Sequence, residues 1–408
     1  MTDAATVDAL VVGAGPAGSN TARLLARDGH RVLLLEDDEV VGEPMQCAGL
    51  VTPRLSKIVA FPQDDVVVNR IRGALIYSPA GRVLELDAGE PHAVLMDRCE
   101  FDRRVARTAT EAGAELWTSA KWMSARRDNG GFESDVLVRR DGKEDTVRIR
   151  SRLLIGADGV QTNVGRAFGI PRPREFLPGY EAEIEGMKLP RSDTIPVFAS
   201  QELAPGFFSW IIPVTNSTGR AGLCMRLRRE SALEHFHRFR AHPQVAPYFT
   251  PESRVTRPIV GTVPLGLPER FTDDGILLVG DACAMPKPTS GGGIYTGLVG
   301  SVFAAETASE ALRRGDTKRR FLRRYERRFM RSRVGREIRI GWRLRRAFLH
   351  LRESEIEDAF RLLASRRATA VLDRFGDIDH PSHLLAPLFL AEPRLLKFLP
   401  KALRGAFR

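Results

Sequence analysis

The chain has 408 residues, 43% of them hydrophobic, which is enough to bury a large core in two or three structural units. Four scattered cysteines, without a CxxC or a paired Cys/His spacing, argue against a disulfide framework and against a metal site. No run reaches the roughly 18 apolar residues that span a bilayer, and the N-terminus runs into a strand pattern instead of a signal peptide. We therefore expect a cytoplasmic α/β protein.

The N-terminal segment has the glycine spacing typical of a dinucleotide-binding turn. Its parts are a strand at 8–12, a turn with Gly13, Gly15 and Gly18, a helix at 19–27 and a strand at 31–35. The glycines permit close backbone approach, and the helix N-terminus offers free N–H groups to a pyrophosphate. Glu36 ends the second strand, where an acidic side chain accepts hydrogen bonds from a ribose. The pattern predicts a Rossmann-like βαβ unit.

Two later segments also place an acidic residue after an apolar strand. The first is the run at 153–156 followed by Asp158, and the second is the run at 275–279 followed by Asp281. The Asp281 carboxylate can reach ribityl or ribose hydroxyls, and glycines at 291–293 precede a predicted helix whose amides would face a flavin. Three such turns in this order favour FAD over a nicotinamide nucleotide.

These turns, the segment PMQCAGL at 44–50, Arg98 and the aromatic run around Trp210 resemble the FAD-dependent geranylgeranyl reductase family. The resemblance extends from about residue 5 to about residue 363, and the Cys-Ala-Gly segment is its most specific motif. It implies an α/β (α+β) fold of the aromatic-hydroxylase type. That fold consists of a Rossmann-like FAD-binding domain, an inserted β-sheet substrate domain and a C-terminal helical region.

The resemblance also assigns residues to the cofactor FAD. Gly18 and Glu36 would contact its ADP half, and Arg98 would bind near the pyrophosphate. Cys47 and Ala48 would approach the flavin ring. The complete set that the resemblance implies is Gly13, Gly15, Ala17, Gly18, Glu36, Cys47, Ala48, Leu50, Arg98, Asp158, Asp281, Gly293 and Ile294.

One departure from the related hydroxylases affects the electron donor. Those proteins place Ser and Arg after the Asp-Gly turn, whereas this chain has Thr162 and an arginine displaced by one residue, Arg166. The departure puts direct docking of a nicotinamide nucleotide at this turn in doubt. The electron donor is therefore left open between NADPH, NADH and ferredoxin.

Alternating apolar patterns interrupt the FAD-binding segments and predict a sheet that covers the flavin. The expected division is an FAD-binding domain at 1–60, 91–169 and 257–314, a substrate domain at 61–90 and 170–256, and a C-terminal helical region at 315–408.

The positive charge is concentrated in one part of the C-terminal region. Residues 313–346 contain 15 arginines and one lysine against three acidic residues, a local charge of +13 in a chain whose net charge is +11. Aromatic and aliphatic residues recur among these cations, which is typical of a basic amphipathic helix at anionic lipid head groups or of a prenyl diphosphate site. A solvated helix face is the alternative, and nucleic acid is not an expected partner. We expect a peripheral membrane protein.

The resemblance implies reduction of isolated double bonds in isoprenoid chains of lipids, diphosphates or quinones. Such an alkene has no carbonyl to stabilise an anion, so protonation must precede or accompany hydride transfer from the flavin N5. Cys47, Tyr295 and a water molecule are the candidate proton donors. Trp210 either shapes the substrate cavity or packs in the sheet core. The alternative functions are an FAD-dependent monooxygenase or halogenase and a non-catalytic FAD-bearing scaffold.

Overall fold

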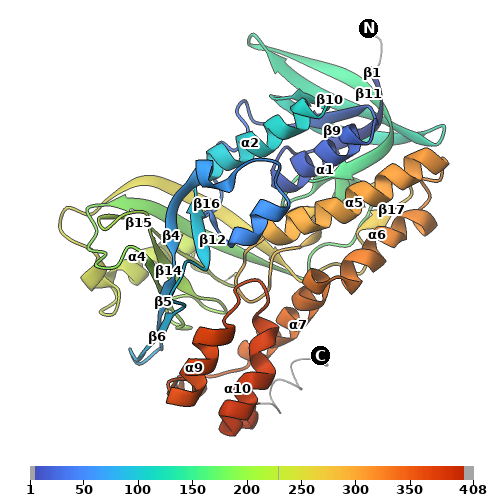
Figure 1. The fold of residues 1–408 in the computed structure, drawn as a ribbon. Helices are drawn as coiled ribbons and strands as arrows, with labels where there is room; N and C mark the ends of the chain where they lie inside the picture. Colours follow the sequence, from blue (N-terminus) through green and yellow to red (C-terminus); the bar gives the residue numbers. More distant parts are fainter. Residues whose placement is uncertain (1–4, 228, 399–408) are drawn as a thin grey trace.

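The computed structural model describes residues 5–227 and 229–398, which form three sheets flanked by helices (Figure 1). The largest sheet has eight strands, and its main path runs β17-β18-β11-β1-β2-β8. Its strands are β1 (Ala5–Val12), β2 (Val32–Leu35), β8 (Glu115–Trp117), β9 (Ala120–Asp128), β10 (Gly131–Arg140), β11 (Lys143–Gly156), β17 (Thr272–Asp273) and β18 (Ile276–Leu278). The central pairs, β1 with β11 and β2 and β11 with β18, are parallel. Their continuous apolar runs are typical of parallel strands that are buried on both faces.

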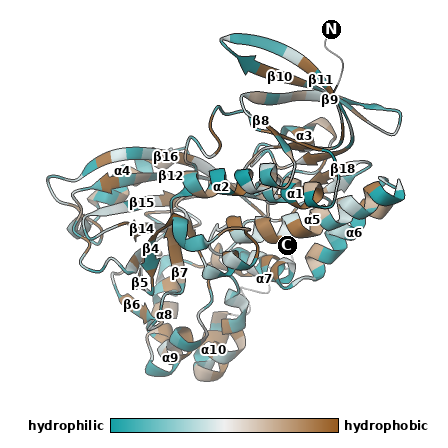
Figure 2. Cartoon of the chain, turned by 45° about the horizontal axis from the view of Figure 1, so that its top comes forward, coloured by the Kyte–Doolittle hydropathy of each residue, from teal (hydrophilic) through white to brown (hydrophobic). Residues whose placement is uncertain are grey.

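Three helices pack beside these parallel strands, with α1 in contact with the other two. They are α1 (Pro16–Arg27), α2 (Arg98–Glu111) and α5 (Ile294–Arg314). Small residues on α5 allow α1 to lie close to it, and Asn20 Nδ2 donates a hydrogen bond of 2.7 Å to Ser301 Oγ between the two helices. Figure 2 shows hydrophilic residues on the outer turns of α2 and hydrophobic residues on inner strands such as β7. The expected βαβ unit is therefore present and its helix is tightly packed.

The second sheet has seven strands in the order β16-β12-β15-β14-β13-β5-β6. They are β5 (Gly73–Tyr77), β6 (Val83–Asp87), β12 (Glu175–Glu185), β13 (Thr194–Phe198), β14 (Ser209–Pro213), β15 (Thr218–Cys224) and β16 (Arg254–Leu265). One face packs against α4 (Ala232–Ala241), whose Phe236 and Phe239 join Ala182 and Leu223 in a buried cluster. Because successive side chains of a strand point to opposite faces, Glu181 and Trp210 lie on the face away from α4.

A three-stranded sheet connects the two larger ones. Its order is β3 (Leu50–Val51), β7 (Ala93–Met96) and β4 (Val67–Ile71). Thus β4, which lies inside the expected 61–90 substrate segment, pairs with β7. The expected boundary at residue 257 falls inside β16, which pairs with β12 along its length. The three sheets together confirm the mixed α/β architecture.

The C-terminal region is helical as expected. Its helices are α6 (Arg319–Arg331), α7 (Arg333–Phe348), α8 (Glu353–Leu363), α9 (Arg366–Phe375) and α10 (Leu385–Ala391). None of the helices within the described residues is long and apolar enough to cross a membrane. Residues 399–408 of the expected membrane-facing region lie outside the described part of the chain.

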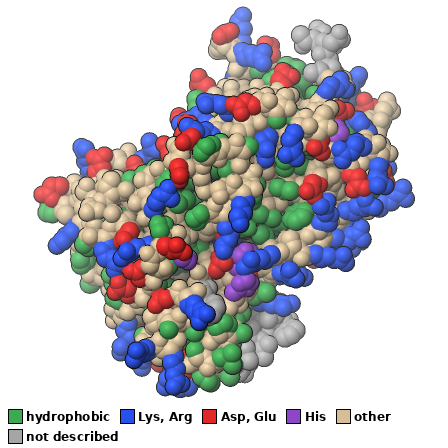
Figure 3. All heavy atoms as spheres, viewed as in Figure 1, with side chains coloured by type: hydrophobic (Ala, Val, Ile, Leu, Met, Phe, Trp, Pro, Cys, Tyr) green, Lys and Arg blue, Asp and Glu red, His purple; other side chains and the backbone are tan. Residues whose placement is uncertain are grey.

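The apolar side of α6, within the basic stretch, is buried against the core. Phe321, Tyr325 and Phe329 pack in the core of the eight-stranded sheet, and Tyr325 Oη donates to the Leu278 carbonyl at 3.0 Å. Glu326 accepts hydrogen bonds from the backbone N–H groups of two successive residues, Phe271 and Thr272, at 2.8 and 2.9 Å. The side left at the surface is cationic, and Figure 3 shows its blue side chains along the edge where α6 lies in Figure 1.

A buried ion pair ties the C-terminal region to the segment that precedes α5. Lys287 Nζ lies 2.7 Å from Asp379 Oδ1, and both residues are at most 6% exposed. The other oxygen, Oδ2, accepts hydrogen bonds from Thr52 at 2.5 Å and from Arg54 at 3.2 Å. Burial raises the pKa of Asp379, but Lys287, Thr52 and Arg54 lower it further, so the net pKa is below its ordinary value.

Replacing Asp379 with Ala should cost about 3 kcal/mol of unfolding free energy, because Lys287 keeps a buried charge without its carboxylate partner. The matched control is Asp373→Ala, which removes an exposed carboxylate from α9. Urea denaturation of the two variants measures the difference. Equal stability of both variants would contradict the expected contribution of this ion pair to the free energy of unfolding.

Candidate active site

The glycine turn between β1 and α1 lies beside the Glu36 carboxylate. Glu36 accepts hydrogen bonds from the N–H of Ala14 at 2.9 Å and of Asp38 at 3.3 Å. Burial raises the pKa of Glu36 to about 7, although these two hydrogen bonds lower it. The N-cap residue of α1, Gly15, makes no side-chain cap, and the first turn of the helix contains no acidic residue. The first-turn N–H groups are therefore available to an anion.

The other two acidic turns meet this glycine turn. A Cβ on Gly13 would lie 2.4 Å from the carbonyl oxygen of Ala157, the residue before Asp158. A Cβ on Gly280, the residue before Asp281, would lie 3.0 Å from the Cβ of Ala17. Glycine at positions 13 and 280 thus lets three backbone segments from distant parts of the sequence come together at the ends of β1, β11 and β18.

The Asp158 carboxylate is only partly satisfied within the protein. Its Oδ2 accepts a hydrogen bond of 3.0 Å from Val164 N, while its buried Oδ1 has no hydrogen-bond partner. Burial raises the pKa of Asp158 above its ordinary value. Thr162 caps α3 (Asn163–Ala167) by accepting from Gly165 N at 3.0 Å, while Arg166 is exposed. The threonine therefore has a local structural role at the position where the hydroxylases carry serine.

The loop that carries Cys47 is held by an arginine from the other sheet. Arg220 of β15 donates to the Ala48 carbonyl at 2.7 Å and to the Met96 carbonyl at 3.2 Å, while its Nε donates to Glu183 at 3.0 Å. Gly49 N donates to Cys47 Sγ at 3.5 Å. Sequence reasoning missed Arg220, because an arginine on a strand indicates nothing about a loop 172 residues away.

Arg98 lies where the Cys47 loop approaches the Asp281 turn. It forms a bidentate contact with Asp102 on the next turn of α2, with an Nη2–Oδ2 distance of 2.5 Å and an Nε–Oδ1 distance of 3.2 Å. Burial lowers the pKa of Arg98, but the charges of Asp102 and Cys47 raise it above its ordinary value. The pKa of Asp281 is raised by burial to about 6, and the nearby Arg98 charge moderates the rise. The structure thus brings Cys47, Arg98 and Asp281 together.

The turn before α5 completes this side of the site. A Cβ on Gly293 would lie 3.0 Å from Asp281 Oδ1, so the N-terminus of α5 adjoins that carboxylate. Ile294 is half-buried and Leu50 pairs with Leu95 in the three-stranded sheet. Tyr295 is half-buried, and burial followed by the Asp379 charge raises the pKa of its phenol. Tyr295 is therefore close to the C-terminal ion pair and is a weak acid.

The seven-stranded sheet places aromatic and apolar side chains opposite these turns. Trp210 donates from its indole Nε1 to Glu181 Oε2 at 2.7 Å, so its polar edge is fixed within the sheet face. A Cβ on Gly291, in the loop before α5, would lie 3.4 Å from Phe207 Cζ and 3.7 Å from Val263 Cγ1. These two residues belong to one apolar cluster, whose other members are Leu177, Phe208, Trp210, Cys224, Leu265 and Trp342.

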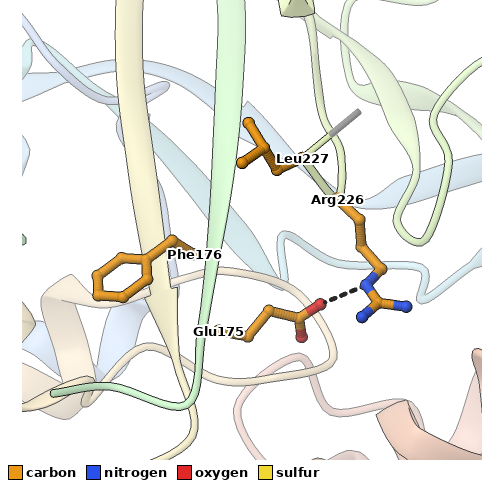
Figure 4. A pocket seen from close by; sticks show the side chains of 4 residues that line it. All are labelled: Glu175, Phe176, Arg226 and Leu227. Carbon is orange, nitrogen blue, oxygen red and sulfur yellow. Dashed lines mark ion pairs between the residues drawn. The ribbon is translucent and has the colours of Figure 1, made fainter. Parts of the chain in front are cut away.

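A hollow of about 360 Å³ opens beside this cluster and is lined by Glu175, Phe176, Arg226 and Leu227 (Figure 4). Glu175 pairs with Arg226 at 2.9 Å, as the dashed line in Figure 4 shows, and with Arg345 of α7 at 2.7 Å. Arg345 also donates to the Gly206 carbonyl at 2.9 Å, and its guanidinium lies 5.4 Å from the Phe207 ring centroid. The hollow therefore combines charged groups with the edge of the apolar cluster.

Comparison with known proteins identifies the family. The FAD binding domain family matches residues 6–338. The digeranylgeranylglycerophospholipid reductase of Methanocaldococcus jannaschii is 30% identical, over 79% of this chain and 82% of that protein. The digeranylgeranylglycerophospholipid reductase 2 of Methanopyrus kandleri is 34% identical, over 78% of this chain and 81% of its own. The chain belongs to the FAD-dependent geranylgeranyl reductase family. This flavoprotein is an oxidoreductase and its cofactor is FAD.

Solved structures confirm the fold of the flavoprotein. A geranylgeranyl bacteriochlorophyll reductase-like protein from Thermoplasma acidophilum has a TM-score of 0.85 at 22% identity, and the match covers 98% of this chain and 99% of that protein. A flavin-dependent brominase has a TM-score of 0.72 at 17% identity over 97% of this chain and 100% of its own. At these identities the likeness is one of fold.

The residues of the site fit FAD. The uncapped first turn of α1 is suited to a pyrophosphate, and nothing lies within 4 Å of the place where a Gly15 Cβ would be. Glu36 lies beside this turn, where a ribose would donate hydrogen bonds to it. The unpartnered Asp158 Oδ1 and the buried Asp281 carboxylate offer further acceptors to hydroxyl groups.

Gly15 and Gly18 should respond differently to alanine. A Cβ on Gly18 would lie 2.0 Å from the Gly13 carbonyl oxygen, so Gly18→Ala should prevent the turn from folding. The space around Gly15 is open, so Gly15→Ala should change the melting temperature of the FAD-free protein by only a few degrees. Because the added methyl group would occupy the space that the pyrophosphate needs, Gly15→Ala should weaken FAD binding about tenfold or more, a loss of about 1.4 kcal/mol or more.

Thermal denaturation and titration with FAD fluorescence measure the two effects. Wild-type FAD affinity in Gly15→Ala would contradict the placement of the pyrophosphate at this turn.

Proposed function

We propose that this flavoprotein reduces isolated carbon–carbon double bonds in geranylgeranyl-type chains of membrane lipids. The relatives named as digeranylgeranylglycerophospholipid reductases, which match about four fifths of the chain, support the substrate class. The observation that carries the proposal is the apolar cluster on the sheet face, which adjoins the loop before α5 through Phe207 and Val263. An isoprenoid chain needs such a water-poor surface beside the flavin.

The hollow in Figure 4 is suited to the polar end of such a lipid. Arg226 is about half exposed and Leu227 is 80% exposed, so this side of the cluster is open to solvent. A prenyl chain that lies along Phe207 and Trp342 would leave its head group near the Arg226 guanidinium. Arginine guanidiniums match phosphate oxygens in geometry and charge.

The exposed cations of α6 and α7 support weak attraction to an anionic membrane. Nine arginines are exposed on these two helices, whereas the apolar side of α6 is buried in the core. Each cation close to an anionic surface contributes about 1 kcal/mol, and this attraction decreases with salt. We therefore propose a peripheral, salt-sensitive contact without insertion of α6.

FAD, when bound and reduced, supplies a hydride to an electron-poor carbon. The protein's own groups would perform three tasks around that transfer. Glu36, Asp158, Asp281 and the first turn of α1 would hold the cofactor, and Arg220 would keep the Cys47 loop against the sheet. The apolar cluster would orient the alkene and exclude water. A group on the sheet face or on the Cys47 loop would deliver the proton.

The proposal is tested by anaerobic reoxidation of the flavin. The flavoprotein is reduced with dithionite, digeranylgeranylglycerophospholipid and menaquinone are added separately, and the visible flavin band and the mass of each lipid are followed. Reoxidation with a gain of two mass units per double bond supports the reductase. No reoxidation until oxygen is admitted, with a gain of sixteen mass units on an acceptor, would instead indicate a monooxygenase.

Cys47→Ser tests the part of the proposal that involves the Cys47 loop. If the thiol participates in the reaction, the variant should keep its FAD content and lose about 100-fold or more in turnover with the prenyl lipid. The matched control is Cys99→Ser, which changes a buried thiol on α2 outside the cofactor turns. Full turnover in Cys47→Ser would remove the thiol from the mechanism.

A further inference from the structure

A carboxyl group lies within the sheet face that we assign to the substrate. Glu181 of β12 pairs with Gly222 of β15, and Gly222 pairs with Trp210 of β14, so the three residues form one row across neighbouring strands. A Cβ on Gly222 would lie 2.8 Å from the Glu181 Cβ and 3.0 Å from its Cγ. Because Gly222 has no side chain, the Glu181 side chain can extend across β15. Its Oε2 lies 2.7 Å from the indole Nε1 of Trp210.

One oxygen of this carboxyl has no partner inside the protein. Glu181 is 4% exposed, its Oε2 accepts from Trp210, and its buried Oε1 has no hydrogen-bond partner. Leaving a buried polar atom unpaired costs free energy, and such atoms in folded proteins commonly mark a functional role or a bound ligand. The Glu181 carboxyl thus has one oriented oxygen and one free oxygen.

The face that carries Glu181 is the one that meets the Cys47 loop. A Cβ on Gly261 of β16, which shares this face, would lie 3.4 Å from the Gln46 carbonyl oxygen. Glu183, two residues along β12, binds Arg220, which in turn holds the Ala48 carbonyl. Glu181 therefore lies in the part of the sheet that the Cys47 loop covers.

The surroundings keep a substantial fraction of this carboxyl protonated near neutral pH. Burial raises the pKa of Glu181 to about 7, while the Trp210 hydrogen bond and the Arg220 charge lower it and Glu183 raises it. Further titratable groups on this side are the thiols of Cys224 on β15 and Cys47 on the loop and the guanidinium of Arg345 on α7, and Ile259 is the neighbour on β16. Burial raises the pKa of Cys224 to about 12, so this thiol is a poor donor.

We propose that Glu181 is the general acid of the reaction and that Trp210 positions it. The inference rests on the proposed reduction of an isolated alkene. The O–H bond of Glu181 breaks, and the π electron pair of the alkene forms a new C–H bond to the less substituted carbon. The tertiary carbon, now electron-poor, accepts the hydride that reduced FAD supplies. The Glu181 carboxylate left behind takes a proton from solvent before the next cycle.

Glu181→Gln tests this role with little change in shape, because the amide oxygen can still accept from Trp210. The variant should bind FAD and digeranylgeranylglycerophospholipid like the wild type and should reoxidise its flavin about 100-fold more slowly or worse with that lipid. The matched control is Glu185→Gln, which changes a half-exposed carboxylate at the end of the same strand, paired with Arg254. The control should react at the wild-type rate.

The pH profile distinguishes an acid from a residue that only supports the fold. The wild-type rate should fall as pH rises through about 7, because the proton donor must be protonated, and Glu181→Gln should lose this fall. Trp210→Phe removes a hydrogen bond that lowers the Glu181 pKa, so the fall should move to higher pH. A purely structural role of Glu181 would leave the shape of the profile unchanged in both variants.

A spectroscopic measurement is independent of turnover. The contribution of Glu181 to the infrared carbonyl band of protonated carboxyl groups should titrate near pH 7 in the wild type and be absent from the spectrum of Glu181→Gln. Subtracting the two spectra isolates Glu181 from Glu36, which titrates in the same range. A difference spectrum without this band would overturn the proposal.

The experiments distinguish a failure of the proposed function from a failure of the proposed general acid. A wild-type protein that reduces no prenyl lipid refutes the proposed function, and the general acid with it. A wild type that reduces the lipid, together with a Glu181→Gln variant of equal rate at every pH, refutes the general acid alone.

Discussion

The close approach of backbone segments at Gly13 determines where the rest of the site can lie. The Ala157 carbonyl occupies the place where a Gly13 side chain would be, and the Gly13 carbonyl occupies the corresponding place at Gly18. The backbones of β1, β11 and α1 are therefore in close contact. Ala17 and Gly280 extend the same packing to β18. Any side chain at positions 13 or 18 would force these strand ends apart. The positions of Glu36, Asp158 and Asp281 therefore depend on the absence of a side chain at these glycines.

The carboxyl groups of the site also make the stability of the protein depend on pH. Desolvation raises the pKa of four carboxyl groups, of which Glu181 is buried and Glu36, Asp158 and Asp281 are half-buried. At a pH between its unfolded and folded pKa values, such an acid keeps its proton in the folded protein but has lost it in the unfolded chain. Through these groups the free energy of unfolding decreases as pH rises from the unfolded pKa values near 4 towards the folded values. A ligand that donates hydrogen bonds to the carboxylates offsets this loss, which links cofactor binding to the stability of the site.

The parts that the sequence predicted are those encoded by consecutive residues. The glycine turn, the two acidic turns and the fold class each follow from a short motif at the end of an apolar run. Arg220, Glu181 and the Lys287–Asp379 pair could not be predicted in this way, because each acts on a partner brought close only by sheet pairing or helix packing. The burial of the apolar side of α6 could not be predicted for another physical reason. Phe321, Tyr325 and Phe329 have the same helical spacing whether they face lipid or a protein core, and only the packed structure distinguishes the two.

The Lys287–Asp379 contact has a consequence for the time at which the cofactor site is completed. The sheet that holds the glycine turn requires β1, β11 and β18, which extend from residue 5 to residue 278. The loop before α5 also forms its buried ion pair with residue 379. During synthesis, the N-terminal βαβ unit emerges long before its neighbours and must wait for contacts that are distant in sequence. The Lys287–Asp379 pair can form only after residue 379 has been synthesised, so this contact is added to the site near the end of synthesis.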